Sequence, residues 1–349
     1  MKYTVVKTDN NPFSDYFARS NPSYHQTILN HYVQTIELII NQDVSVLLTE
    51  FRKDKNKRAD TVMLYCCGFD DYFYHFQAFK YDKKDFDIIV VDIHGFGYNK
   101  RYPANNPYPV ENRFNYYDDS EDIVKQLSVA FGYIKQAYAY KETYLYSHST
   151  GCHIVINYLY YLQKNNKPID FKRVLLCSPL TRFYDPSPIK LMLLVVFSIL
   201  VSFVHKYFDL NALVNGTDKP NDKTYYNKAL NNIYNTKDLC YINYNYTGRV
   251  IQPILVGWLS FVEVSTRTMK SSKLQIDCPV RMVCSQSYGS VGYFVSDHLL
   301  NPAFMVEDCK ALFKNLEFRQ YKAGHDTLLS PFDNGTGISY KDVLDYLLA

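Results

Sequence analysis

The sequence predicts an α/β fold in which a mostly parallel sheet of eight strands is flanked by helices and interrupted by one helical insertion. Short runs of β-branched and aromatic residues alternate along the chain with longer stretches of helical character, which is the pattern of parallel strands joined by crossover helices. The alternation breaks once, between residues 181 and 275, and a structureless loop of such length is implausible in a compact domain. With 47% hydrophobic residues, the chain of 349 residues can bury a substantial core.

Eight runs are expected to form the strands, and several are apolar throughout, as in strands buried on both faces. In chain order they are Thr35–Ile40, Val44–Phe51, Val62–Cys66, Phe86–Ile93, Thr143–Ser147, Arg173–Cys177, Val280–Ser285 and Leu316–Tyr321. The first two flank the polar residues 41–43 and are expected to pair as an antiparallel hairpin. Helices are expected at Tyr116–Ala139, Gly151–Lys164 and Pro302–Lys314.

The break in the pattern divides the chain into a core in two parts, residues 1–180 and 276–349, and an inserted cap or lid, residues 181–275. The most apolar segment of the cap, Leu191 to Val204, has no charged residue. A helix of that length spans about 21 Å, which is short of the bilayer core of about 30 Å. A buried or lid helix is therefore favoured, and a helix that touches a membrane surface is the alternative.

Charge and cysteine content narrow the choice of partners. The formal net charge is only +3 and the charges are scattered, which disfavours a nucleic acid as the partner. The N-terminal segment has no apolar stretch of signal-peptide length. The eight cysteines lack the paired spacing of a zinc site. We therefore expect a cytoplasmic protein with reduced thiols, whose cap could contact a membrane peripherally.

Ser149 is the expected nucleophile. It lies in Ser147-His148-Ser149-Thr150-Gly151, between an expected strand and an expected helix. A sharp turn there strains the backbone and exposes the hydroxyl, and small residues two positions away on either side allow the strand and helix to approach closely. The helix N-terminus favours developing negative charge. Since Ser147 replaces the first glycine of GxSxG, a turn that only caps the helix is the alternative.

A serine hydroxyl needs a base, and His325 is the expected one. It follows the last expected strand, where the chain order of nucleophile, acid and histidine requires it. His148 and His153 flank the serine, but their backbones face elsewhere in such a turn. Asp297 is the expected acid because it is the first carboxylate after the strand Val280–Ser285, although the loop between them must fold back. Asp185, after the preceding strand, is the competitor.

Two backbone N–H groups are expected to form an oxyanion hole, which stabilises the charge on the substrate oxygen. One belongs to Thr150, the residue after the nucleophile. The other belongs to Phe69, in the loop Cys67-Gly68-Phe69-Asp70-Asp71 after the third expected strand. The segment His94-Gly95-Phe96-Gly97 also has the composition of an oxyanion motif, but it follows the fourth strand. We interpret it as a glycine-rich turn.

Together these segments resemble the α/β-hydrolases of the lysophospholipase and monoacylglycerol-lipase type, also described as serine-aminopeptidase-like. The similarity runs from about residue 30 to the C-terminus, and five motifs in the right order make it specific. The segments that match the HGFNDYFF, DLRGYGRS, GHSTGG, GWL and GGxHDxxLS motifs of the family are, in order, Cys67 to Phe73, Asp92 to Gly97, Ser147 to Cys152, Gly257 to Leu259 and Ala323 to Ser330. The chain departs from them at Cys67, Ser147 and Cys152, which replace a histidine and two glycines.

The resemblance implies an α/β-hydrolase fold in which Ser149, Asp297 and His325 match the catalytic triad. We expect hydrolysis of a carboxylic ester through an acyl-serine intermediate. A lipid-like substrate is favoured because the apolar segment of the insertion lies where a lid would cover the pocket. The alternatives are a peptidase or thioesterase with the same triad, and a binding protein without turnover. No metal or organic cofactor is implied, because the triad itself supplies nucleophile, base and charge stabilisation.

Overall fold

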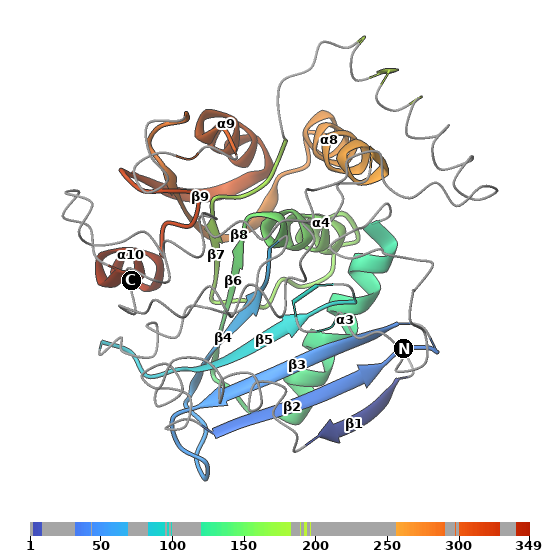
Figure 1. Ribbon diagram of the computed structural model, residues 1–349, viewed down its shortest axis with the longest axis vertical. Coiled ribbons are helices and arrows are strands. Elements are labelled where there is room, and N and C mark those ends of the chain that lie inside the picture. The colour runs from blue at the N-terminus through green and yellow to red at the C-terminus, as the bar shows by residue number, and fades with distance from the viewer. Residues whose placement is uncertain are drawn as a thin grey trace, which may run out of the picture.

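A single sheet forms the centre of the protein in the computed structural model (Figure 1). The structure describes residues 3–8, 32–42, 44–68, 83–94, 96–97, 99, 120–182, 189, 192–193, 196, 256–289, 297, 300–328 and 340–349. Within these residues the sheet has nine strands in the order β1-β2-β3-β5-β4-β6-β7-β8-β9. Their bounds are β1 Thr4–Thr8, β2 Tyr32–Ile39, β3 Ser45–Arg52, β4 Thr61–Cys66, β5 Asp87–Asp92, β6 Glu142–His148, β7 Arg173–Cys177, β8 Ile276–Ser285 and β9 Phe313–Tyr321.

The sheet is antiparallel at one end and parallel from β5 to β9. β2 and β3 pair antiparallel, so the expected hairpin is confirmed. β3 also pairs antiparallel with β5, whereas every later pair is parallel. β1 is a ninth strand that the sequence did not suggest, and it adds an edge beside β2. Its five residues are too few to display a periodic pattern, and Val5 points an apolar side chain toward solvent.

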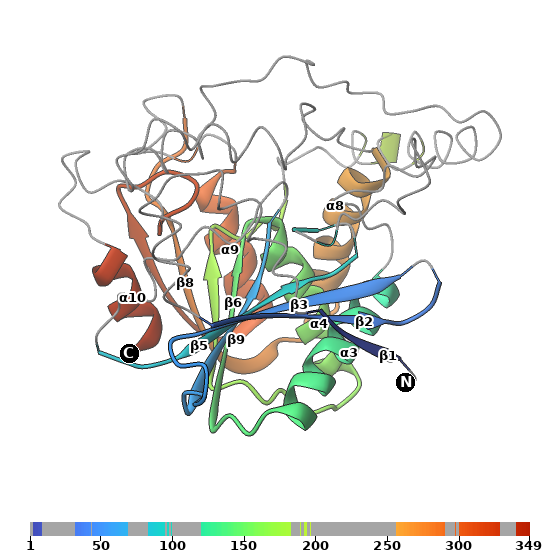
Figure 2. The same cartoon turned by 60° about the horizontal axis from the view of Figure 1, so that its bottom comes forward.

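Helices cover both faces of the parallel strands. They are α3 Ser120–Ala137, α4 Thr150–Lys164, α8 Val256–Ser271, α9 Pro302–Leu312 and α10 Tyr340–Leu348. Val280, Met282 and Cys284 of β8 belong to the same buried cluster as side chains of α3, α4 and α9. Arg281, which points to the other face, donates a hydrogen bond to the carbonyl of Tyr346 in α10 at 2.6 Å. Figure 2 shows α10 and α3 on opposite sides of the sheet.

Burial on both faces explains the continuous apolar runs of the sequence. Every residue of β4 and of β5 is buried, as expected for central strands of a covered parallel sheet. The carboxyl ends of β4, β6, β7, β8 and β9 lie along one edge, as the register of Cys66 with Ser147 and of His148 with Cys177 shows. Residues that follow these strands therefore lie close together.

The part of the chain expected to form the cap is described at few positions. The helix α8 lies within it, beside α4 (Figure 1). Asp185 and most of Leu191 to Val204 lie outside the described residues. The division at residues 180 and 275 stays a prediction. Among the described helices, none is long and apolar enough to cross a membrane.

Candidate active site

Ser149 occupies the turn between β6 and α4 in a backbone conformation that a serine rarely adopts. Its φ is 54° and its ψ is −118°, in a region where L-residues are strained. Three backbone hydrogen bonds hold this turn. The Ser149 N–H donates to the Cys177 carbonyl, and the Ser149 carbonyl accepts from the N–H groups of Leu180 and Cys152, each at 3.0 Å. The loop after β7 therefore fixes the serine in its strained position.

Gly151 allows the helix α4 to start directly against β4. A Cβ at this position would lie 2.4 Å from the carbonyl oxygen of Cys66 and 2.6 Å from that of Cys67. These are backbone atoms of the last residue of a central strand and of the residue after it, and they cannot easily move aside, so a glycine is favoured here. The contact also places the end of β4, from which the expected oxyanion loop departs, next to the turn that carries Ser149.

The structure brings together the three residues that the sequence suggested as nucleophile, base and acid. The His325 Nε2 lies 2.9 Å from the Ser149 Oγ. The His325 Nδ1 lies 2.8 Å from the Asp297 Oδ2. Both distances are those of hydrogen bonds, and both the imidazole and the carboxylate are buried. A proton can therefore pass from the serine to the imidazole while the carboxylate fixes the tautomer and stabilises the imidazolium.

Hydrogen bonds fold the loop after β8 back so that Asp297 reaches the imidazole. The Asp297 N–H donates to the Ser287 carbonyl at 2.9 Å and also lies 3.1 Å from the Ser285 Oγ. The Asp297 carbonyl accepts from the Gly289 N–H at 3.0 Å. Its second carboxylate oxygen, Oδ1, accepts the Leu300 N–H at 2.8 Å. The acid is thus anchored to the end of β8 by its backbone and to the start of α9 by its side chain.

The structure describes only part of the expected oxyanion hole. Thr150 is the first residue of α4, where a backbone N–H has no acceptor within the helix. Phe69 lies outside the described residues, which end at Gly68 in this loop. In the other glycine-rich segment, Gly97 has a φ of 50°, and a Cβ on it would lie 2.0 Å from Oδ1 of Asp92. This close approach accounts for that glycine without a role in catalysis.

A buried polar cluster, which sequence reasoning missed, lies beside His325. His148, Cys177 and Asp326 are buried, with their possible metal-ligating atoms within 4.8 Å of one another. Burial and the negative charge of Asp326 raise the pKa of the Cys177 thiol well above its usual value. The signal of this cluster in the sequence is adjacency, because His148 precedes Ser149 and Asp326 follows His325.

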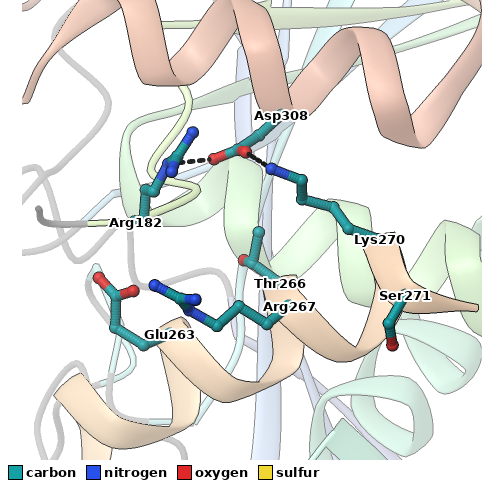
Figure 3. Close-up of a pocket in the computed structure, with 7 residues that line it drawn as sticks. All are labelled: Arg182, Glu263, Thr266, Arg267, Lys270, Ser271 and Asp308. Carbon is teal, nitrogen blue, oxygen red and sulfur yellow. Dashed lines mark hydrogen bonds and ion pairs between the residues drawn. The ribbon is translucent and has the colours of Figure 1, made fainter. Parts of the chain in front are cut away.

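A separate cleft of about 370 Å³ lies between α8, α9 and the loop after β7 (Figure 3). Its lining side chains are Arg182, Glu263, Thr266, Arg267, Lys270, Ser271 and Asp308. The Asp308 carboxylate lies 3.0 Å from the Arg182 Nε and 2.5 Å from the Lys270 Nζ. Ser149, Asp297 and His325 are not among the residues that line this cleft. Its charges join α8 and the β7 loop to α9, so we interpret it as a polar helix interface.

The fold and the arrangement around Ser149 define an α/β-hydrolase with a serine nucleophile elbow. A model of the family described as serine aminopeptidase, S33, matches residues 57–247, more than half of the chain. The chain belongs to this family. The expected fold class and the expected class of enzyme, a serine hydrolase, are thereby confirmed. No curated protein has a matching sequence.

Solved structures with the same fold include two that differ in their reported activity. The monoacylglycerol lipase of Paleococcus ferrophilus is 15% identical, with a TM-score of 0.50 over 84% of this chain and 95% of its own. The thioesterase domain from the curacin biosynthetic pathway is 12% identical, with a TM-score of 0.52 over 91% of this chain and 99% of its own. At these identities the likeness is one of fold.

Proposed function

We propose that the protein hydrolyses a carboxylic ester, with Ser149 as nucleophile, His325 as general base and acid, and Asp297 as the residue that orients the imidazole. The observation that carries the proposal is the hydrogen-bond chain from Asp297 through His325 to Ser149, with distances of 2.8 and 2.9 Å. The serine at its end lies in a strained turn before a helix N-terminus, which is the geometry of an activated nucleophile.

The proposed reaction has two steps that use the same imidazole. His325 takes the Ser149 proton as the serine oxygen attacks the carbonyl carbon, and the backbone N–H groups of Thr150 and Phe69 receive the negative charge of the substrate oxygen. The imidazolium then gives its proton to the oxygen of the alcohol, which departs, and the acyl group remains bound to Ser149. In the second step His325 removes a proton from water as the water oxygen attacks the acyl carbon. The bond between this carbon and the Ser149 Oγ then breaks, the imidazolium returns the proton to the Ser149 Oγ, and the acid is released.

A lipid-like ester, of the lysophospholipase or monoacylglycerol-lipase type, is the proposed substrate class. In the expected cap, Ile189, Met192, Leu193 and Val196 expose between 46% and 68% of their surfaces. Their spacing of three, one and three residues places them on one face of a helix. Such an apolar face favours contact with an acyl chain or with the surface of a membrane. Among proteins with this fold, one is named as a monoacylglycerol lipase.

Labelling with a fluorescent fluorophosphonate tests the nucleophile. We expect wild type to be labelled, and Ser149→Ala and His325→Ala to lose the label while they remain folded. Ser178→Ala is the matched control, because Ser178 also follows a strand, is buried and has a positive φ of 45°. Labelling that persists in Ser149→Ala, or its absence from folded wild type, would overturn the proposal.

Substrate panels then test the acyl class. We expect long-chain monoacylglycerols or lysophospholipids to be cleaved faster than short soluble esters. Met192→Ser with Leu193→Ser should lower the rate on long-chain esters more than on short ones. Val5→Ser, which alters an exposed apolar residue of β1, should leave both rates unchanged. An equal loss on both substrates would refute the role of the apolar face. Cleavage of aminoacyl-arylamides but not of esters would instead select the peptidase that the family description suggests.

A further inference from the structure

Behind the base, a second buried pair joins a strand to the loop that carries His325. His148 is the last residue of β6 and Asp326 directly follows His325. Both side chains are fully buried, and the His148 Nε2 lies 4.0 Å from the Asp326 Oδ2. The His148 and His325 rings have centroids 5.0 Å apart and are tilted by 58°. His148 therefore contacts both the base and the residue after it.

Asp326 also shapes the loop itself. Its Oδ1 accepts the Leu328 N–H at 3.1 Å, two residues further on, which is the hydrogen bond of an Asx-turn. His148, in contrast, belongs to a central strand whose neighbours are β4 and β7. A side chain on a rigid strand thus packs against a loop whose conformation decides where the imidazole of His325 lies. Positioning of this kind is typical of residues that support a catalytic group.

Within the part of the chain that the structure describes, the titratable side chains around the two imidazoles include Asp297, Asp326, Cys177 and Tyr146. Burial, and to a smaller extent the Asp326 charge, raises the pKa of the Cys177 thiol and of the Tyr146 hydroxyl well above their usual values, so both side chains are neutral. A buried carboxylate is stabilised only by a cation or by hydrogen bonds. The imidazolium that His325 becomes when it takes the Ser149 proton supplies a positive charge near Asp326.

We propose that Asp326 and His148 form a positioning pair for His325, in which Asp326 fixes the loop and adds a second buried carboxylate that favours the imidazolium formed when Ser149 attacks. The inference rests on the proposed function, because it assigns a role to residues that do not touch the substrate. Asp297 orients the imidazole through Nδ1, whereas the pair acts through the His148 ring, whose centroid lies 5.0 Å from that of His325. Charge placed in advance near an imidazolium lowers the barrier to its formation.

Asp326→Asn is the decisive variant because it removes the charge but keeps an oxygen that can accept the Leu328 N–H. We expect the rate constant of fluorophosphonate labelling to fall on the order of tenfold at its plateau. Loss of a negative charge makes the imidazolium less favourable, so the base stays neutral to lower pH. The acid limb of the labelling rate should therefore move down by roughly half to one pH unit. A residue with only a structural role would lower the plateau without moving this limb.

Two controls separate the outcomes. Asp87→Asn removes a buried carboxylate at the start of β5, at the opposite edge of the sheet, and should leave the limb in place. If Asp326→Asn does not fold, Asp326→Ser replaces it, because its hydroxyl can accept the same N–H without a charge. If an Asp326 variant is labelled but the acid limb of its labelling rate stays where it is in wild type, this inference alone is overturned. Folded wild type that takes no label would overturn the proposed function and this inference with it.

Discussion

At the scale of single residues, backbone hydrogen bonds hold Ser149, the proposed nucleophile, in place. A non-glycine residue with the φ of 54° seen at Ser149 costs about 1–3 kcal/mol of strain. Hydrogen bonds to Cys177, Leu180 and Cys152 offset that cost. The strain is retained because it presents the hydroxyl to the imidazole. Changes that relax the turn should therefore reduce reactivity before they reduce folding.

Gly151→Ala tests this close approach. The new Cβ would lie 2.4 Å from the Cys66 carbonyl oxygen, so the helix must move away from β4 and carry Ser149 with it. We expect a loss of labelling by at least tenfold and a destabilisation of roughly 1–3 kcal/mol. Gly132→Ala in α3 is the matched control, since nothing lies within 4 Å of its Cβ; it should stabilise by about 0.5–1 kcal/mol. Denaturant unfolding and labelling measure both, and wild-type labelling in Gly151→Ala would contradict the argument.

Asp297→Asn tests the role of the acid. The amide can still accept the Leu300 N–H, which the Asp297 Oδ1 accepts at 2.8 Å, so the loop should stay folded. It presents a donor or a neutral oxygen to His325, and the imidazole loses its stabilised charge. We expect kcat to fall on the order of 10⁴-fold on whichever ester proves to be a substrate. A loss of less than tenfold would show that another carboxylate orients the base.

The sequence predicted Ser149, Asp297 and His325 as a triad because each follows a recognisable strand, and the structure brings their side chains within hydrogen-bond distance. The sequence was not sufficient for His148. That residue was set aside because its backbone was expected to face elsewhere in the turn, yet its ring lies 5.0 Å from that of His325. Adjacency in the chain marks His148 and Asp326 as neighbours of Ser149 and His325, but it does not reveal that their side chains lie together. The turn at Ser149 and the loop at His325 have to be placed together before this contact becomes visible.

At the scale of elements, α8 is attached to the core by polar contacts in addition to the buried apolar side chains of Val262 and Met269. The His153 Nε2 of α4 lies 3.0 Å from the Ser265 Oγ of α8. The Phe261 ring packs edge-on against the same imidazole. On the opposite side, Lys270 of α8 pairs with Asp308 of α9. Attachment through ionisable groups makes the position of α8 sensitive to pH and to charge substitutions.

His153 should make stability depend on pH. Burial lowers the pKa of His153 from 6.5 to about 4, so the folded protein holds it neutral. The unfolded chain binds the proton first as the pH falls, and the stabilisation present above pH 6.5 is lost on the way down to about 4. His153→Gln should remove on the order of 2–3 kcal/mol of this dependence. Denaturant unfolding across that range measures it, and parallel curves for variant and wild type would refute it.

Asp308→Ala tests the charged interface of Figure 3. It leaves the Arg182 and Lys270 cations without the carboxylate that lies 3.0 and 2.5 Å from them. We expect a loss of about 1–3 kcal/mol in the free energy of unfolding, because both cations lose their buried partner and keep only the exposed Glu307 carboxylate. Asp60→Ala, in a pair with Lys141 that is about 70% exposed on both sides, should cost less than about 1 kcal/mol. Equal effects would show that the α8–α9 pair is not coupled to folding.

Element boundaries were less predictable than the elements. β8 begins at Ile276 rather than at Val280. Its first four residues alternate between buried and exposed positions, and the exposed ones are Asp277 and Pro279, which are unusual in strands. The proline has no N–H for the ladder, and the register shifts between Ile276 and Pro279. Likewise, α9 ends at Leu312 and β9 begins at the next residue. No turn residue marks this junction in the sequence.

At the scale of the whole molecule, the proposed active site and a buried polar network lie at opposite edges of the sheet. The proposed catalytic residues follow the carboxyl ends of the strands, whereas the opposite edge carries a buried network of carboxylates and tyrosines. There the Asp87 Oδ2 accepts the Ala59 N–H at 3.0 Å and the Tyr140 hydroxyl at 3.1 Å. Burial raises the pKa of Asp87 from 3.8 to about 6. The two edges should therefore respond to pH independently.

Asp87→Asn tests that independence. Because the pKa of Asp87 is raised in the folded state, the folded protein holds its proton longer, and stability is lost as the pH rises from 3.8 to about 6. The variant should therefore gain stability relative to wild type over that range. Its labelling by a fluorophosphonate should match wild type at neutral pH. Urea unfolding at several pH values gives the first result, and a changed labelling rate would contradict the separation.

The distance along the chain between nucleophile and base also has a consequence for synthesis. The two residues that form the 2.9 Å contact are 176 positions apart, and the base follows β9, an edge strand. At roughly 5–20 residues per second, a ribosome needs about ten to thirty-five seconds to add that segment. Throughout that interval the emerging polypeptide carries a serine without its proton acceptor. The proposed nucleophile and base can therefore come together only late in translation, after β8 and β9 have joined the sheet.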